Sequence, residues 1–161
     1  FHHDSADRLL ADGYDFLIDA IDGAGPKVEL IARCHQRGQP LISAMGAAGR
    51  LGAEHIQIAD ISRTDVCPLC RVVRKRLGRR GIRAGIPVVY SREPVAQKPA
   101  PPETITDDLR EERLERGRRR SIQPSAVFLP AVFGLLAAQY VVNRLLADAD
   151  KQRPQSCRPE S

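Results

Sequence analysis

The order of patterns over residues 15–43 is the feature that most constrains the fold. Residues 15–21 are rich in β-branched and aromatic side chains and predict a short buried strand. Residues 26–37 carry apolar side chains at helical spacing and end at Gly38, and residues 40–43 predict a second strand. Strand, helix and strand in this order predict a βαβ unit, whose ligands bind beyond the carboxyl ends of the strands.

The remaining patterns extend this unit into an α/β domain. Residues 7–13 predict a helix end closed by glycine, before the first strand. A half-exposed strand, a basic helix, a further short strand and a long apolar helix follow, over residues 55–61, 66–77, 86–90 and 125–147. The composition divides the chain into a domain, a Pro-rich charged linker, an apolar helix that packs on the domain and a polar tail, over residues 1–96, 97–121, 122–148 and 149–161.

The net charge of +5 conceals a cluster of positive charge in the predicted basic helix. Residues 71–83 contain seven basic side chains and no acidic one: Arg71, Arg74, Lys75, Arg76, Arg79, Arg80 and Arg83. Such a segment favours a polyanionic partner. A solvated helix face that keeps the protein soluble is an equally weighted alternative.

Membrane insertion is not expected from the sequence. The N-terminus has no charged and apolar leader, and the apolar run over residues 126–142 contains Pro130 and Gln139 and is short for a membrane span. We therefore expect a cytoplasmic protein. In that compartment Cys34, Cys67, Cys70 and Cys157 are expected to be reduced thiols.

The turn after the first predicted strand contains Gly23 and Gly25 but does not match a dinucleotide-binding loop. Val28 takes the place of the third glycine, and Pro26 removes one backbone N–H that would hold a phosphate. Asp22, at the end of the strand, then has two interpretations. It caps the following helix, which the residues alone favour, or it holds a hydrated Mg²⁺ against nucleotide phosphates.

Several segments together resemble one enzyme family. They are residues 18–22 (IDAID), Pro26-Lys27 with the helix to Cys34, residues 40–42 (PLI), 45–49 (MGAAG), 56–69 (IQIADISRTDVCPL), 88–93 (VVYSRE) and 125–138 (SAVFLPAVFGLLAA). The chain is similar over these segments to the C-terminal half of tRNA threonylcarbamoyladenosine dehydratases, in the superfamily of ubiquitin-activating-type adenylating enzymes.

The resemblance implies a Rossmann-like mixed sheet of the ThiF/MoeB type, with residues 1–96 forming the C-terminal part of the adenylating domain. It implies ATP and Mg²⁺ as cofactors, and adenylation of the carboxylate of threonylcarbamoyladenosine at position 37 of tRNA, which then cyclises with loss of water. Asp22 matches the family's metal-associated aspartate, and Lys27 faces the phosphates or solvent. The tRNA would bind Arg71, Arg74, Lys75, Arg79 and Arg80 through its phosphates. A homodimer through the terminal helix, and sulfur-transfer accessory proteins, are further expected partners.

One departure from the family keeps other functions open. The family's glycine-rich nucleotide loop, ribose-binding acid and phosphate-binding Arg and Lys precede the part resembled, so this chain alone is expected to be inactive. One alternative is an adenylating enzyme for a sulfur-carrier protein, which would need a second Cys-x-x-Cys pair. Another is a non-catalytic tRNA-binding or dimerising module.

For Cys67 and Cys70, in Cys-Pro-Leu-Cys, a structural role is favoured over metal or redox chemistry. Their joint replacement by Ser is expected to leave stability and activity nearly unchanged. Cys34 is expected to face the core as a small hydrophobe.

Overall fold

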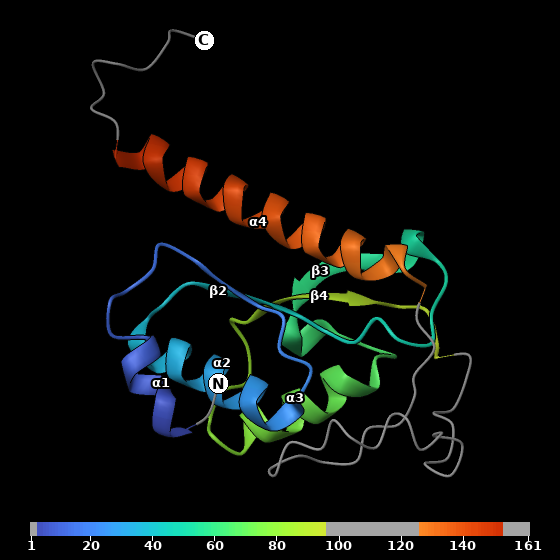
Figure 1. The fold of residues 1–161 in the computed structure, drawn as a ribbon, viewed down its shortest axis with the longest axis horizontal. Coiled ribbons are helices and arrows are strands. Elements are labelled where there is room, and N and C mark those ends of the chain that lie inside the picture. The colour runs from blue at the N-terminus through green and yellow to red at the C-terminus, as the bar shows by residue number, and fades with distance from the viewer. Residues whose placement is uncertain (1–2, 96–125, 153–161) are drawn as a thin grey trace, which may run out of the picture.

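A computed structural model of the chain describes residues 3–95 and 126–152. Four strands form one sheet, and the longer helices pack on its two faces (Figure 1). In chain order the elements are α1 (His3–Leu9), β1 (Leu17–Asp19), α2 (Ala24–Arg37), β2 (Leu41–Ala44), β3 (Ile56–Asp60), α3 (Pro68–Gly78), β4 (Pro87–Ser91) and α4 (Phe128–Gln152), with short 3-10 turns at Ala53–His55 and Ile61–Arg63. The linker, the end of the tail and Cys157 lie outside the described residues.

The sheet has the strand order β1-β2-β4-β3 and is mixed, as the resemblance predicted. β1 pairs in parallel with β2, and β2 with β4, whereas β3 runs antiparallel along β4. β4 is the most buried strand, because it is central and has helices on both sides, and its apolar run Val88-Val89-Tyr90 suits such a position. The carboxyl ends of β1, β2 and β4 therefore meet at one edge of the sheet.

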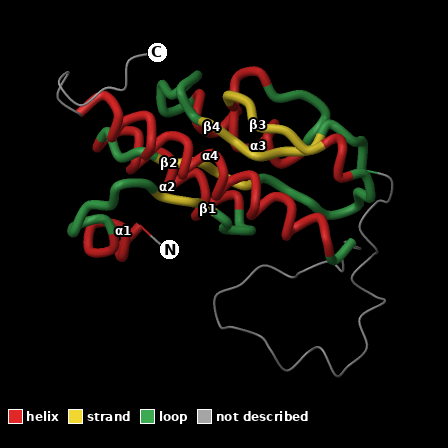
Figure 2. The backbone as a smooth tube through the Cα atoms, turned by 90° about the horizontal axis from the view of Figure 1, so that it is seen from above, coloured by secondary structure: helices red, strands yellow, loops and turns green. Residues whose placement is uncertain are grey.

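Helices α2 and α3 pack together on one face of the sheet, and α4 crosses the other (Figures 1 and 2). The larger core lies between the sheet and the first pair of helices, with Val28, Ile31 and Cys34 from α2 and Val73 and Leu77 from α3. α2 ends at Gly38, whose φ of 64° lets its N–H reach the last carbonyls of the helix. The smaller core is formed by Ile42 and Val89 of the sheet and by Phe133 and Ala137 of α4.

Two elements differ from the sequence prediction. The strand expected over residues 15–21 is present, but it is only three residues long, and Ile18 in it is 48% exposed, so its expected length and full burial are wrong. The reason is that β1 is an edge strand, whose one partner among the described residues is β2. The apolar helix is longer than its apolar run and continues past Val142 to Gln152.

This greater length bears on the expectation about membranes. Among the described residues, α4 is the one helix long and apolar enough, by length and composition, to cross a bilayer. Its most apolar 18-residue window has a mean hydropathy of 1.4, and 17% of that window is buried. The N-terminal part of α4 is packed on the sheet through Leu129, Phe133 and Ala137, and the rest of this window is largely exposed.

Candidate active site at the carboxyl edge of the sheet

Asp22 lies in the turn between β1 and α2, at the edge where the parallel strands end. It does not cap α2: the helix begins at Ala24, Gly23 occupies the N-cap position, and no side chain bonds to the free N–H groups there. The favoured interpretation of Asp22 as a helix cap is therefore wrong. Its carboxylate is exposed and makes no hydrogen bond or ion pair within the part of the chain that the structure describes.

A free carboxylate at this edge fits one direct contact with a hydrated Mg²⁺, which takes oxygen ligands and keeps several of its waters. The described residues hold no group of three or more His, Cys, Asp or Glu side chains that could form a complete metal site. Asp22 would thus be a single protein ligand, with water and phosphate oxygens completing the coordination.

Beneath this turn, a buried polar network joins β1, β2 and α2. Lys27 Nζ donates hydrogen bonds to Asp19 Oδ2 at 2.8 Å, to Ser43 Oγ at 3.3 Å and to the Ala44 carbonyl at 2.8 Å. Asp19 Oδ2 also accepts from Ser43 Oγ at 2.5 Å, and its Oδ1 accepts from the Ile21 N–H at 2.9 Å. Burial lowers the pKa of Lys27, while the charge of Asp19 and its hydrogen bond act to raise it. The network fixes the ends of both strands and the start of the turn that carries Asp22.

The position of Lys27 differs from both sequence-based expectations. Its side chain is completely buried, so it lies neither in solvent nor toward a phosphate at the surface. All three hydrogens of its ammonium group are used inside the protein. Asp19 and Ser43, which sequence reasoning did not select, are its partners; an acidic residue inside a predicted strand was the available signal.

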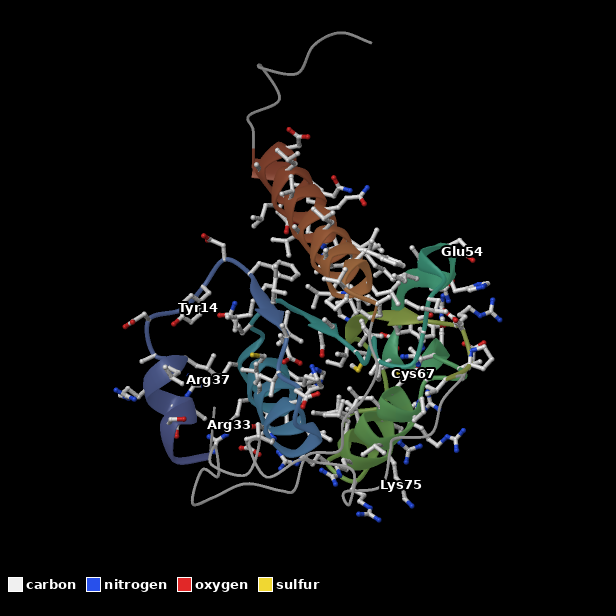
Figure 3. The ribbon with its side chains drawn as sticks, turned by 45° about the vertical axis from the view of Figure 1, so that its right-hand side comes forward. Tyr14, Arg33, Arg37, Glu54, Cys67 and Lys75 are labelled. Atoms are coloured by element: carbon white, nitrogen blue, oxygen red, sulfur yellow. The ribbon has the colours of Figure 1, made fainter. Side chains whose placement is uncertain are left out.

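The basic segment forms the outer side of α3 and the turn after it. Figure 3 shows Lys75 on this side of the helix, among other nitrogen-bearing side chains. Five of the seven basic side chains are exposed and make no side-chain hydrogen bond or ion pair within the described residues: Arg71, Lys75, Arg76, Arg79 and Arg83. We call these five residues the α3 basic surface.

The other two basic side chains have structural roles. Arg74 is half-buried, and its Nη1 donates to the Ile61 carbonyl at 3.2 Å and to the Thr64 carbonyl and hydroxyl at 2.7 Å each. Arg80 forms an ion pair of 2.7 Å with Glu29 of α2, and together with Arg33 it lowers the pKa of Glu29. Of the five residues predicted to bind tRNA, Arg71, Lys75 and Arg79 therefore have free side chains. Arg74 and Arg80 are already bonded to other residues of the protein.

A surface cavity of about 270 Å³ lies at the other end of the sheet. It is lined by Pro40 and Leu41 at the start of β2, by Pro87 at the start of β4, and by Tyr140 and Arg144 of α4. Because these are the amino ends of the parallel strands, the cavity is separate from the edge that carries Asp22.

Comparison with known proteins confirms the resemblance seen in the sequence. tRNA threonylcarbamoyladenosine dehydratase of Bacillus subtilis (strain 168) is 38% identical over 145 residues, which are 88% of this chain and 54% of the relative. tRNA threonylcarbamoyladenosine dehydratase 2 of Saccharomyces cerevisiae is 34% identical over 141 residues, 81% of this chain and 31% of the relative. The Escherichia coli (strain K12) relative is 28% identical over 157 residues, 92% of this chain and 58% of its own length. No protein-family model matches the chain.

Solved structures agree with these relatives. The crystal structure of E. coli tRNA N6-threonylcarbamoyladenosine dehydratase, TcdA, in complex with AMP superposes with a TM-score of 0.72 at 27% identity. The match covers 92% of this chain and 55% of TcdA. The complex of the same enzyme with ATP gives a TM-score of 0.71 at 26% identity, over 93% and 55% of the two chains. The mixed α/β fold predicted from the sequence is thus confirmed, and the chain spans about half the length of these bacterial relatives.

Proposed function

We propose that this chain is part of a tRNA threonylcarbamoyladenosine dehydratase, an enzyme that uses ATP to activate and cyclise the carboxylate of a threonylcarbamoyl group on tRNA. The observation that carries the proposal is the similarity to relatives of that name over most of this chain, together with solved structures in complex with ATP and AMP. Mg²⁺ would supply charge neutralisation at the ATP phosphates.

In this proposal Asp22 holds the metal, and the Asp19–Lys27–Ser43 network positions the turn that presents it. The support is the free, exposed carboxylate of Asp22 at the end of β1. The buried network bonds to the Ile21 N–H, one residue before Asp22, so it restrains that turn directly. Lys27 has no phosphate-binding role here, because its ammonium group is already saturated.

The experiment uses a protein in which this chain is joined to the nucleotide-loop half of a relative. We expect ATP-dependent conversion of threonylcarbamoyladenosine in tRNA to its cyclic form, measured by mass spectrometry of nucleosides. Asp22→Asn should keep the fold and abolish most of the conversion, since a neutral amide is a poor Mg²⁺ ligand. Asp12→Asn is the matched control, because Asp12 is equally exposed but lies in the turn before β1. Full activity of Asp22→Asn would remove Asp22 from the site.

The chain alone is expected to bind ATP poorly, because the segments that match the family do not include its nucleotide loop. Isothermal calorimetry with ATP and Mg²⁺ tests this expectation. A submicromolar dissociation constant would show that this half contains a nucleotide site of its own.

For tRNA, we propose that the α3 basic surface holds the phosphate backbone. The logarithm of the binding constant falls linearly with the logarithm of the salt concentration. Each phosphate that a variant no longer neutralises should reduce the magnitude of this negative slope by about 0.7–0.9. The triple variant Arg71→Gln, Lys75→Gln, Arg79→Gln should therefore weaken tRNA binding and flatten its salt dependence in filter-binding assays. A control with the same change in charge replaces Arg8, Arg144 and Lys151, which lie on other elements. Equal slopes for the two variants would leave the α3 basic surface as a solubility feature.

A homodimer is proposed to form through the outer side of α4. Phe128, Ala131, Leu135, Ala138, Val142 and Leu145 are all exposed and alternate at spacings of three and four residues, which is the pattern of a coiled-coil seam. Leu135 is 70% exposed. The double variant Leu135→Gln, Val142→Gln should be a monomer where the unchanged protein is a dimer, as measured by light scattering. Flotation with lipid vesicles tests membrane binding separately from dimerisation. A cytoplasmic location is part of this proposal.

A further inference from the structure

Cys67 and Cys70 lie together at the N-terminal end of α3, and the proposed function does not use them. Cys67, which is labelled in Figure 3, is the N-cap residue, Pro68 is the first helical residue, and Cys70 follows within the first turn. Residues three apart share one face of a helix, so the two sulfurs are neighbours. Both residues belong to the larger core and are 2% and 1% exposed.

A buried guanidinium group lies near enough to this end of α3 for its charge to act on Cys67. Arg50 donates from Nε to the Glu93 carbonyl at 2.9 Å and from Nη1 to the Gly46 carbonyl, and the residue is 3% exposed. A Cβ atom placed on Gly46 would lie 3.9 Å from Arg50 Nη1 and 3.9 Å from the Leu69 side chain, so the guanidinium group and the first turn of α3 are both neighbours of Gly46. Its Nη2 is the one buried side-chain nitrogen or oxygen in the described residues without a hydrogen-bond partner.

A buried cation is costly without an anion near it, and two groups near Arg50 supply one: the charge of Arg50 acts to lower the pKa of both the Glu93 carboxylate and the Cys67 thiol. The neighbouring Cys70 thiol lowers the pKa of Cys67 against the effect of burial, and the N–H groups of Cys70 and Leu69 and the charge of Arg50 act in the same direction. The same contact and burial raise the pKa of Cys70. Cys34 provides a contrast, because burial raises its pKa to about 11. Thiolates at helix N-termini beside Arg are the reactive class of cysteine.

We propose that Cys67 and Cys70 form a peroxide-reactive pair, in which Cys67 is the nucleophile, Cys70 the resolving thiol and Arg50 the group that holds the Cys67 thiolate. The burial of both sulfurs favours hydrogen peroxide over larger disulfide oxidants. The residues on either side of Cys67, Val66 and Pro68, are exposed, so the buried Cys67 is next to the protein surface along the chain.

The chemistry is a two-step oxidation. The Cys67 thiolate attacks one oxygen of hydrogen peroxide, the O–O bond breaks, and a sulfenic acid forms with release of hydroxide. The Cys70 sulfur attacks the sulfenic sulfur and displaces a second hydroxide. These two hydroxides take up the two thiol protons and become water, so two thiols and one peroxide give one disulfide and two waters. Sulfur is oxidised and peroxide is reduced.

The test treats the folded full chain with hydrogen peroxide, blocks the remaining thiols by alkylation and maps each cysteine by mass spectrometry. A Cys67–Cys70 disulfide that dithiothreitol reverses is the expected product. Cys70→Ala should stop the reaction at a sulfenic acid on Cys67 that dimedone traps, whereas Cys67→Ala should leave Cys70 reduced. Cys67 should react at least about tenfold faster than Cys34, because the pKa of Cys67 is lowered whereas burial raises the pKa of Cys34.

Cys34 is the internal control, because it is as buried as Cys67 but has a raised pKa. Oxidation of Cys34 at the rate of Cys67 would show that the reaction follows unfolding, and would overturn the proposal. The same conclusion follows if Cys67 stays reduced, or if it pairs with any thiol other than Cys70. Arg50→Gln should slow the oxidation several-fold and Arg50→Lys should restore most of it; wild-type rates in both would remove Arg50 from the pair.

Discussion

Replacement of Lys27 by Met tests the buried network directly. The substitution keeps a long unbranched side chain but removes the charge that faces Asp19, whose carboxylate is 1% exposed. Removing one partner of a buried ion pair costs about 3–5 kcal/mol. Asp19 keeps two neutral donors, the Ser43 hydroxyl and the Ile21 N–H, so we expect a loss near the lower limit, about 3 kcal/mol.

The free energy of unfolding of the full chain is measured by urea titration at pH 7, followed by circular dichroism. For a chain of this size a loss of about 3 kcal/mol lowers Tm by about 6–12 °C. The double variant Lys27→Met, Asp19→Asn removes both charges and should recover more than half of the loss. Lys75→Met, on the exposed side of α3, is the control and should change stability by less than about 0.5 kcal/mol.

A loss of less than about 1 kcal/mol for Lys27→Met would refute the reasoning, because a buried pair cannot be broken at that small a cost. The ammonium group would then lie in solvent, and the sequence-based interpretation of Lys27 as a phosphate-facing residue would be restored.

Three further predictions concern the supports of the fold. Arg74→Gln should cost about 1.5–3 kcal/mol in urea unfolding, because its hydrogen bonds to Thr64 are charge-assisted, whereas Arg71→Gln should be nearly neutral. Asp60→Asn should lower Tm at neutral pH. Burial opposes the ionisation of Asp60, but hydrogen bonds from Ser62 and Gly85 bring its pKa in the folded protein below 3.8. The ionised carboxylate therefore stabilises the fold above pH 3.8, and this stabilisation is lost as the pH falls through the folded pKa. A difference in Tm between wild type and Asp60→Asn that persists in full under strong acid would contradict this. Phe133→Ala should cost about 3–5 kcal/mol by opening a cavity between α4 and the sheet, and a smaller loss of under about 1 kcal/mol would mean that α4 is not docked there.

The βαβ unit could be predicted from the sequence because its signals are local. Apolar side chains at helical spacing, a closing glycine and a following β-type run each depend on near neighbours, and α2 and β2 begin and end within a few residues of the prediction. The exposure of Ile18 could not be predicted in this way, since it depends on which strands lie beside β1.

The candidate site was predicted less completely, because pairing across the fold decides the roles of charged residues. Lys27 meets partners that lie 8 and 16 residues away in the sequence, and they come together only when β1, β2 and α2 have assembled. Partners outside the basic segment also set Arg74 and Arg80 apart from the other basic residues of that segment. Arg74 bonds to Thr64, and Arg80 forms an ion pair with Glu29. Burial likewise changes the expectation for Cys67→Ser with Cys70→Ser, because two hydroxyl groups in an apolar core should cost stability.

The uneven burial of α4 has a consequence for its local opening. Phe133 and Ala137 anchor the N-terminal part of the helix to the sheet, whereas every residue from Val142 to Lys151 is exposed. Backbone amides open with free energies that follow the packing around them, so amide hydrogen exchange should be slow near Phe133 and fast beyond Val142, within one unbroken helix. Slow amide exchange beyond Val142 would then show that another surface covers this part of α4, and the degree of slowing would measure how firmly it is covered.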